Sequence, residues 1–454
     1  MSHSALEEVV SLVKSRSGNP VAYAGTIEYS AYDDFSILIA AIECKESGWE
    51  TGGLEVAEQM FKHLLSKSPD YAAAFYELAV VHRYQRRLRE ALTCAVQAAR
   101  KAPDNSSYAL FLAHMFYANG CWDEGNAALD RIAPANPNDR AQIAAMRGFG
   151  DYLKEFPRER ARYITDAIRQ RHYWMSVEEV AEAIKSAIRS QQGFALVRLG
   201  DGEGTFARVN LEDERRFADL YSHCRSFWVR FLLGESFDPT WTGYEALTAH
   251  LMPFVQQADI LGVAYWDWLD YEYSIAAERT IPCLLNINRY VLDNIKHITL
   301  CNQDIHLQLH QTGLLKGILR NLQSVSVISC LEGLDAKIRE MFEIKNVDLI
   351  RIPSENYAPH LAHLAARDSR SHFPQFFWNI MHFLARPHDG KVFLIAAGTL
   401  GKYYACVIKK HGGIALDLGS IVDGWMKLPS RPYYASTFGI DDVNKSADVS
   451  YSDK

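Results

Sequence analysis

The stretch Phe194–Phe206 reads FALVRLGDGEGTF and marks the point where the chain changes character. Apolar residues run up to Leu199, and glycines then alternate with Asp201 and Glu203. A short apolar run that ends in a glycine-rich turn is typical of a buried strand that meets a loop at the edge of a parallel sheet. The stretch therefore predicts a strand of an α/β domain, with two carboxylates at the end of that strand.

The second half of the chain repeats this pattern of apolar, β-rich runs. Helical stretches separate several of the runs, including 333–344 and 399–412. Near-continuous apolar strands that alternate with helices predict a doubly wound, Rossmann-like α/β domain with a parallel sheet covered on both faces. Sheets of this kind bind ligands at the carboxyl ends of their strands. The runs are FALVRL (194–199), ILGVAY (260–265), SVSVIS (324–329), VDLIRI (347–352), KVFLIAA (391–397) and GIALDLG (413–419).

Three prolines in the first third of the chain are evenly spaced. Pro69, Pro103 and Pro137 lie 34 residues apart, and small residues recur in the same register at Ala57 and Ala91. A 34-residue period is that of the tetratricopeptide repeat (TPR), a helix-turn-helix unit. The region resembles tetratricopeptide proteins, and the resemblance implies an α-helical TPR solenoid that binds a protein segment or associates with itself. A plain helical bundle is the alternative.

The change of pattern divides the chain into four predicted parts. Between the repeats and the strands lies a charged helical stretch, in which Ser176 followed by Glu179 is the pattern of a helix N-cap with a capping box. The parts are a TPR-like helical domain (1–155), a helical linker (156–192), the α/β domain (193–430) and a C-terminal tail (431–454).

Composition narrows the classes of function. The 454 residues carry a net charge of −7, which argues against broad nucleic-acid binding because such surfaces are basic. None of the eight cysteines forms a CxxC pair, which argues against a zinc ribbon. The chain does not begin with a basic stretch followed by an apolar core, and it has no uninterrupted apolar run of about 18 residues, so we expect a cytoplasmic protein without a membrane span.

Asp201 and Glu203 are the candidate metal ligands. In an extended segment, side chains two residues apart point the same way, and two carboxylates on one side suit Mg²⁺ or Mn²⁺. Gly200 and Gly202 would let the backbone approach a phosphate closely. Arg198 could neutralise phosphate charge or hold the carboxylates in place. A solvated acidic turn is the alternative interpretation of the same residues.

The motif RLGDGEG (198–204) resembles the opening motif of the GT-D fold glycosyltransferases, in which an arginine precedes Gly-Asp-Gly-Glu. Two later segments are also similar to that family: IPSENY (352–357), like its proline-containing loop, and 394–425, like its last strand, glycine-rich turn, helix and strand. The resemblance spans roughly 190–428. Ser420 departs from the pattern, since family members often carry a histidine there.

This resemblance implies an activity and a cofactor. In the family, the Asp-x-Glu pair is the metal-associated element that handles the diphosphate of a nucleotide sugar. The resemblance therefore implies that Asp201 and Glu203 hold Mn²⁺ or Mg²⁺ and act in sugar transfer.

A second glycine-rich turn opens the predicted helix at 399–412. Backbone amides at a helix start favour a phosphate or a ligand hydroxyl, although the turn could be a tight strand-helix connection alone. Asp417 lies in the apolar run IALDLG, where an unpaired charge is costly, so we expect it to have a partner or a ligand. The candidate ligand-binding residues of the turn are Gly398, Thr399, Gly401 and Lys402.

Three further positions are candidates for binding or chemistry. Asp267 follows the second predicted strand among tryptophans and tyrosines, and we predict it as the base that deprotonates an acceptor hydroxyl. An ordinary charge on an aromatic surface helix is the alternative. Asn356 could bind a base or a ribose, or simply form a turn. His306 and His310 share one helical face, and we expect satisfied or exposed histidines rather than a zinc site.

Together these features predict a metal-dependent glycosyltransferase. It would move a sugar from a nucleotide-sugar donor, such as a UDP-sugar, to a protein or glycan acceptor recruited by the TPR groove, and the repeats could also pair two copies of the chain. One alternative is a TPR scaffold with an inactive nucleotide-binding domain. The other is a metal-dependent nucleotide phosphohydrolase, in which Asp417 or His306 would complete the metal site.

Overall fold

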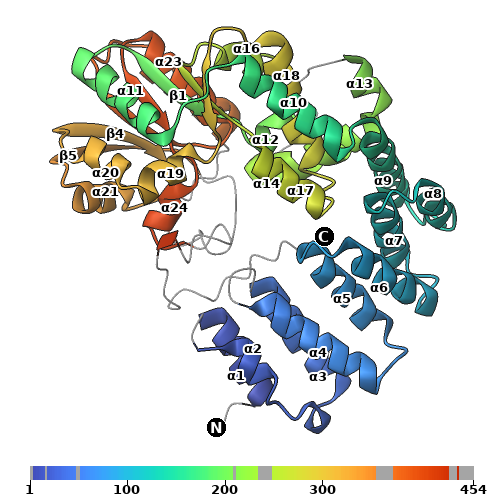
Figure 1. The fold of residues 1–454 in the computed structure, drawn as a ribbon. Coiled ribbons are helices and arrows are strands. Elements are labelled where there is room, and N and C mark those ends of the chain that lie inside the picture. The colour runs from blue at the N-terminus through green and yellow to red at the C-terminus, as the bar shows by residue number, and fades with distance from the viewer. Residues whose placement is uncertain are drawn as a thin grey trace. The chain divides into compact units, whose positions relative to one another are not determined.

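The structure is a computed structural model that describes residues 4–15, 18–47, 52–207, 211–233, 248–353, 372–428 and 437–438. The chain divides into two compact units (Figure 1). The helical unit consists of the described residues of Met1–Glu155, Tyr271–Glu278 and Arg431–Lys454. The sheet unit consists of those of Phe156–Asp270 and Arg279–Ser430.

The helical unit is a succession of helices that pack against their neighbours in chain order (Figure 1). Helices α5 and α7 begin 34 residues apart, as do α6 and α8. The bounds are α1 (Ala5–Ser15), α2 (Pro20–Ala24), η1 (Tyr29–Ala31), α3 (Asp34–Ser47), α4 (Gly53–Lys67), α5 (Ala72–Tyr84), α6 (Leu88–Lys101), α7 (Ser106–Ala118), α8 (Trp122–Asp130) and α9 (Pro137–Glu155).

Small residues set the close approach of these helices. Ala57 and Ala91 are fully buried. A Cβ at Gly125 would lie 2.4 Å from the Tyr117 ring, and one at Gly150 would lie 2.8 Å from it. The ring of Tyr117 therefore fills the space left by two glycines, and larger residues there would force the helices apart.

One segment from far along the chain, Tyr271–Glu278, belongs to the helical unit. Arg83 donates from Nε to the carbonyl oxygen of Ile275 at 2.7 Å, and His114 Nε2 lies 2.6 Å from the carbonyl oxygen of Ala276. Arg83 and His114 are both buried. Since buried polar groups are costly without partners, the segment contributes hydrogen-bond partners to two buried side chains of the helical unit.

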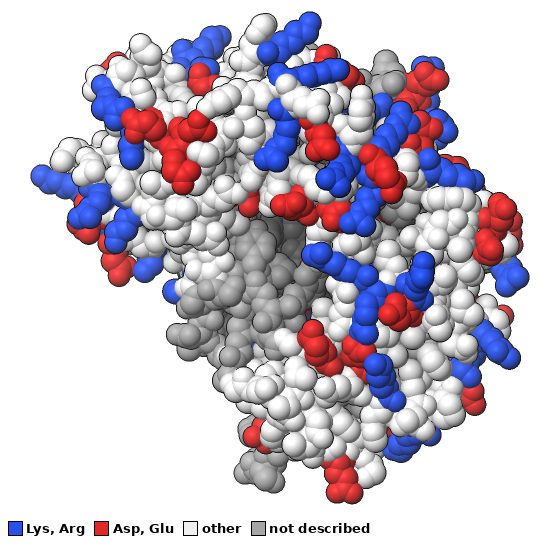
Figure 2. Space-filling view, viewed as in Figure 1, with Lys and Arg blue, Asp and Glu red and all other residues white. Residues whose placement is uncertain are grey.

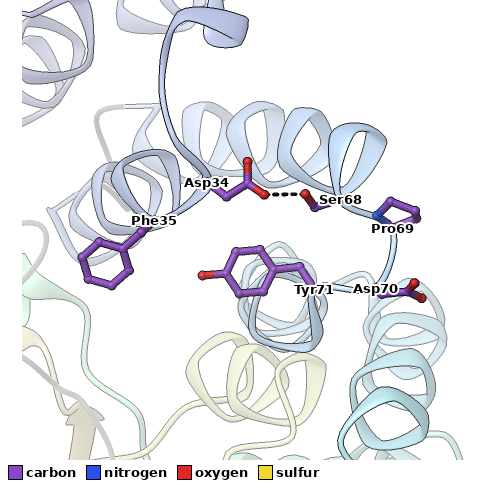
Figure 3. A pocket seen from close by; sticks show the side chains of 6 residues that line it. All are labelled: Asp34, Phe35, Ser68, Pro69, Asp70 and Tyr71. Atoms are coloured by element: carbon purple, nitrogen blue, oxygen red, sulfur yellow. Dashed lines mark hydrogen bonds between the residues drawn. The ribbon is translucent and has the colours of Figure 1, made fainter.

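A pocket in the helical unit lies where α3 and α5 begin (Figure 3). Ser68 donates a hydrogen bond to Asp34 across it. None of its lining residues belongs to the sheet unit. The lining residues are Asp34, Phe35, Ser68, Pro69, Asp70 and Tyr71.

The sheet unit is built on seven parallel strands in the order β3-β2-β1-β7-β6-β4-β5, which confirms a mixed α/β fold with a parallel sheet. Strand β1 lies between β2 and β7, so that Leu196 pairs with Ile260 on one side and with Leu416 on the other. The bounds are β1 (Phe194–Arg198), β2 (Ile260–Val263), β3 (Thr299–Asn302), β4 (Ser324–Ser329), β5 (Asn346–Arg351), β6 (Val392–Ala396) and β7 (Ile414–Asp417).

All six predicted runs contain strands, and sequence reasoning missed only β3 among the seven. Every residue of β1 and β7 is buried, because helices cover the sheet and leave no polar face. Strand β3 reads TLCN and has only four residues, which is too short and too polar to stand out as an apolar run.

The helices of the sheet unit begin with α10 and α11, which lie in the predicted linker. The helix α17 starts in this unit, but its residues from Tyr271 onward belong to the helical unit. The predicted capping box is confirmed: Ser176 Oγ accepts from the Glu179 amide at 3.3 Å, and the Ser176 amide donates to Glu179 at 2.8 Å. No helix in the described part of the chain has the length and apolar character needed to cross a bilayer. The bounds are α10 (Arg158–Arg171), α11 (Val177–Ser190), α12 (Asp201–Gly204), α13 (Leu211–Arg216), α14 (Ala218–Leu233), α16 (Leu251–Val255), α17 (Trp266–Ser274), α18 (Ile281–Asn294), α19 (Ile305–Gln311), α20 (Leu314–Leu319), α21 (Leu334–Phe342), η3 (His372–Phe376), α22 (Phe377–Leu384), α23 (Leu400–Lys410) and α24 (Ile421–Trp425).

Candidate functional site

Residues at, or just after, the ends of three neighbouring strands meet at the carboxyl edge of the sheet. Arg198 ends β1, Asp417 ends β7, and Lys402 lies in the first turn of α23, which follows β6. Because β1, β7 and β6 are adjacent and parallel, their carboxyl ends lie side by side. This edge is where open α/β sheets bind their ligands.

Arg198 and Asp417 form the centre of the cluster. The Arg198 amide donates to Asp417 Oδ2 at 3.0 Å, and its Nε donates to the Asp417 carbonyl oxygen at 2.9 Å. The two residues are 5% and 2% exposed. Gly419 has φ +53°, and a Cβ there would lie 2.1 Å from an Arg198 guanidinium nitrogen. The turn after β7 therefore requires glycine both for its backbone angle and for the space that Arg198 occupies.

Lys402 is the second buried cation. Its Nζ donates to Asp417 Oδ2 at 2.6 Å and lies 3.6 Å from Glu203 Oε1. Burial alone would raise the pKa of Asp417, but the charges of Lys402 and Arg198 and the hydrogen bonds they donate outweigh burial and hold that pKa below its ordinary value. The expectation that Asp417 has a partner is met by two cations.

Glu203 has structural partners for both carboxylate oxygens. Oε2 accepts from the Gly200 amide at 2.8 Å, and Oε1 accepts from Thr399 Oγ1 at 3.1 Å. The side chain is buried. Glu203 thus ties the glycine-rich turn after β1 to the turn after β6, which fixes the relative position of the two loops.

The expectation that Asp201 and Glu203 lie in an extended segment is wrong. They belong to the short helix α12, which begins at Asp201, because Glu203 reaches back to the Gly200 amide and caps that turn. Two residues on a helix are about 200° apart around its axis, so the two carboxylates do not share a side. Asp201 Oδ1 accepts from the Gly202 amide at 2.9 Å, and the residue is half-buried.

The helical turn places the two carboxylates on different sides of α12, which disfavours a cation shared by the two acids, and each Glu203 oxygen also accepts a hydrogen bond within the protein. Across the described ranges, no three His, Cys, Asp or Glu side chains come together as a metal site would need. The metal roles predicted for Asp201 and Glu203 remain predictions, and of the two acids Asp201 is the one that the solvent still reaches.

The glycines of the two turns have packing roles as well as conformational ones. A Cβ at Gly200 would lie 3.3 Å from Gln303 Nε2 and from Glu203 Oε2. A Cβ at Gly401 would lie 2.9 Å from Ile395 Cγ2. Gly398 has φ +53° with open space around its Cβ position, so that glycine is required by the backbone angle alone. Asn356, predicted to bind a base or ribose, lies outside the described residues.

Asp267, the predicted base, is the second residue of α17 and follows β2. It is exposed, and no side-chain partner is found for it among the described residues. Three residues along the same helix, Asp270 accepts from Arg158 Nε at 2.7 Å. Of these two acids, Asp267 is therefore the one whose carboxylate is open to a ligand.

The end of β3 adds His306, which the sequence suggested for the site only under the phosphohydrolase alternative, and Gln303, which it did not suggest. His306 is buried, with Nδ1 2.8 Å from an Arg198 guanidinium nitrogen. That guanidinium nitrogen of Arg198 also donates to the Gln303 carbonyl oxygen at 3.3 Å. The sequence signal that could have located these residues is the polar stretch NQD at 302–304. It can be assigned to a strand end only if TLCN is recognised as a strand. The expected interpretation of His306, a satisfied histidine, agrees with these contacts.

Asp304 is a second missed residue beside this cluster. Its Oδ2 accepts from the Tyr265 hydroxyl at 3.1 Å, and its Oδ1 accepts from Gln308 Nε2 at 2.8 Å. Burial raises the pKa of Asp304 above its ordinary value, against the effect of these hydrogen bonds. The Asp304–Tyr265 bond joins the loops that follow β3 and β2.

No protein-family model matches the chain, and no curated protein matches it. Among solved structures, a mutant O-GlcNAc transferase of Thermobaculum terrenum matches with 14% identity, over 88% of this chain and 78% of that one, at a TM-score of 0.27. A TM-score of that size does not establish a shared fold, so the functional interpretation depends on the site itself.

Proposed function

We propose that the chain is a glycosyltransferase that moves a sugar from a nucleotide-sugar donor, a UDP-sugar in the first instance, to a protein or glycan acceptor. The observation that carries the proposal is the convergence of Arg198, Glu203, Lys402 and Asp417 at the carboxyl edge of the sheet, beside the open carboxylate of Asp267. The motif RLGDGEG and the 34-residue helix spacing support the GT-D subtype and a TPR solenoid as parts of the same proposal.

In this proposal the buried cluster is the scaffold of the donor site. Its two cations, Arg198 and Lys402, are balanced by two carboxylates, so the cluster holds the loops rigid without adding net charge. The glycine turns at 200–204 and 398–402 then present backbone to the donor. Backbone amides at the start of α23 favour the donor's phosphates.

The acceptor is activated at the neighbouring strand end. Asp267 would accept the proton of the acceptor hydroxyl as the oxygen attacks the anomeric carbon, while the bond from that carbon to the donor diphosphate breaks. A positioned base of this kind contributes about 10²–10⁴ in rate.

A divalent cation, Mn²⁺ or Mg²⁺, is part of the proposal with Asp201 as its protein ligand. When bound there, it would neutralise charge on the leaving diphosphate. Glu203 is not proposed as a ligand, because its oxygens hold Gly200 and Thr399.

The proposal is tested by thermal shift and by product analysis. A panel of nucleotide sugars, each with and without Mn²⁺, should include one that raises the melting temperature, and that donor should release a nucleoside diphosphate on turnover. Free phosphate as the product would instead indicate a phosphohydrolase. Absence of binding to every nucleotide sugar would overturn the proposal in favour of a scaffold.

A further inference from the structure

Helix α10 carries a row of arginines on one face. Arg158, Arg162 and Arg169 are spaced by four and seven residues, which places them along one side of an α-helix. The side chains of Arg158 and Arg162 are 51% and 64% exposed, and Arg169 is exposed as well. We refer to these three residues as the arginine row.

The row runs along the carboxyl edge of the sheet. The Arg162 guanidinium lies 5.5 Å from the centre of the Trp266 ring, and Trp266 is the first residue of α17, directly before Asp267. Arg158, at the N-terminal end of the row, forms an ion pair with Asp270, which also lies on α17. The distance between the nitrogen and the oxygen is 2.6 Å. The arginine row therefore borders the helix that carries the proposed base.

The other end of the row reaches the end of β3. The Arg169 guanidinium lies 5.0 Å from the centre of the Trp174 ring. Trp174 Nε1 donates to Asn302 Oδ1 at 3.0 Å, and Asn302 is the last residue of β3. Tryptophan rings thus support two arginines of the row, at the ends of two neighbouring strands.

The guanidinium groups of Arg162 and Arg169 keep hydrogen-bonding capacity for a further partner, whereas that of Arg158 is paired with Asp270. When a guanidinium stacks on an aromatic ring, the face of the guanidinium contacts the ring, and its N–H donors point outward in the plane of the guanidinium. The ion pair of Arg162 with Asp166 is 3.7 Å long and both side chains are more than half exposed, so it contributes little. Figure 2 shows Lys and Arg side chains, mixed with Asp and Glu, over the region where α10 lies in Figure 1.

We infer that the arginine row binds an acidic polypeptide segment, and that the acceptor of the proposed transfer is a protein with carboxylates near its hydroxyl group. This inference rests on the proposed function. Each guanidinium is a planar fork that matches a carboxylate. Asp166, Asp267 and Asp270 lie between or beside the arginines and would repel a continuous phosphate backbone or an anionic membrane, but leave room for separate carboxylates.

The spacing of the row sets the spacing expected in the partner. Arg162 and Arg169 are seven residues apart, which is about 10 Å along a helix. An extended peptide advances about 3.3 Å per residue. Because side chains of an extended peptide alternate between its two sides, only carboxylates an even number of residues apart can face the row together. Carboxylates four residues apart, about 13 Å, are within reach of the two long arginine side chains, with the acceptor hydroxyl toward Asp267.

The experiment measures binding of a fluorescein-labelled peptide in which glutamates four residues apart flank a serine. Its counterpart with glutamines, single-stranded DNA and phosphatidylserine vesicles serve as the other probes. The double variant Arg162→Glu/Arg169→Glu should weaken binding of the acidic peptide at least about tenfold, because two charge-assisted contacts become repulsive. The milder pair Arg162→Gln/Arg169→Gln should weaken it less.

A matched control is Arg189→Glu/Arg320→Glu, which reverses two arginines of the same unit that are 63% and 52% exposed but lie outside α10. It should leave peptide binding unchanged. Equal binding of the glutamine peptide, equal loss in the control, or preference for DNA or vesicles would overturn the inference. Donor-induced thermal shift in the same variants separates the two proposals: if the donor still binds, only the acidic acceptor is refuted, whereas absence of donor binding in wild type refutes the transferase.

Discussion

Lys402 Nζ lies 2.6 Å from Asp417 Oδ2, in a buried cluster where the same carboxylate oxygen also accepts from the Arg198 amide at 3.0 Å. One carboxylate thus contacts both a lysine from α23 and an arginine from β1. Removing one member of a buried ionic cluster leaves the others uncompensated, which costs more than the cluster itself contributes.

The substitution Asp417→Asn should therefore lower the free energy of unfolding by about 3–5 kcal/mol. Urea denaturation followed by circular dichroism measures the change. The exposed pair of Lys391 and Asp348, N to O 2.6 Å, supplies the control: Asp348→Asn should cost no more than about 1 kcal/mol. Equal effects of the two substitutions would contradict the proposed importance of burial.

The same carboxylate predicts a pH dependence. The pKa of Asp417 in the folded protein lies below its ordinary value of 3.8, so its contribution to stability is present above that pH and is lost as the pH falls through the folded value. The difference in unfolding free energy between wild type and Asp417→Asn should be constant near neutral pH and shrink below about pH 3.8. A difference that does not shrink in acid would show that Asp417 is not ionised in its buried site.

Gly419→Ala should destabilise the protein more than Gly412→Ala. Both glycines have positive φ, +53° and +79°, but a Cβ at Gly419 meets Arg198 at 2.1 Å whereas nothing lies within 4 Å of one at Gly412. The backbone angle costs about 1–2 kcal/mol at either position, and displacement of Arg198 adds about 1–3 kcal/mol at Gly419. Melting temperatures of the two variants, side by side, test the difference.

Substitutions of Asp201 and of Glu203 should have different effects on the melting temperature and on the Mn²⁺ dependence of donor binding. Glu203→Gln replaces a buried, fully bonded carboxylate and should lower the melting temperature, whereas Asp201→Asn should leave it near that of wild type. Asp201→Asn should instead reduce the stabilisation that a nucleotide sugar gains from Mn²⁺. If Asp201→Asn has no effect on the Mn²⁺ dependence, the cation is not bound there.

Asp267→Asn should reduce kcat for transfer by about 10²–10⁴ without altering donor binding. Asp270→Asn, on the same helix but paired with Arg158, should leave kcat close to wild type. Rates at saturating donor, with the donor's thermal shift as the binding readout, distinguish loss of a base from loss of a binding group.

The sequence predicts the sheet better than it predicts the site. Short apolar runs such as 392–396, rich in β-branched and aromatic residues, favour buried strands of a covered sheet, and the charge of Asp417 within an apolar run indicates that it has partners. The identity of those partners, Lys402 on the helix after β6 and Arg198 at the end of β1, can be predicted only once the order of the strands in the sheet is known.

The local shape of the motif is harder to predict. GDGEG reads as a loose turn, because glycine is a poor helix former. The helix α12 forms because a single carboxylate, on Glu203, closes back on the Gly200 amide. A contact of that kind depends on where Thr399 and Lys402 hold the carboxylate, and those residues lie almost 200 positions further along the chain.

The docking of Tyr271–Glu278 against Arg83 and His114 has a practical consequence for dissecting the chain. Cutting after Glu155 would separate the N-terminal part of the helical unit from the segment Tyr271–Glu278, in which the carbonyl groups of Ile275 and Ala276 bond Arg83 and His114. In the excised fragment, the Arg83 guanidinium and the His114 imidazole would be exposed to water instead of bonded to backbone carbonyl groups. Expression of this fragment on its own should therefore include the segment Tyr271–Glu278 as a separate peptide.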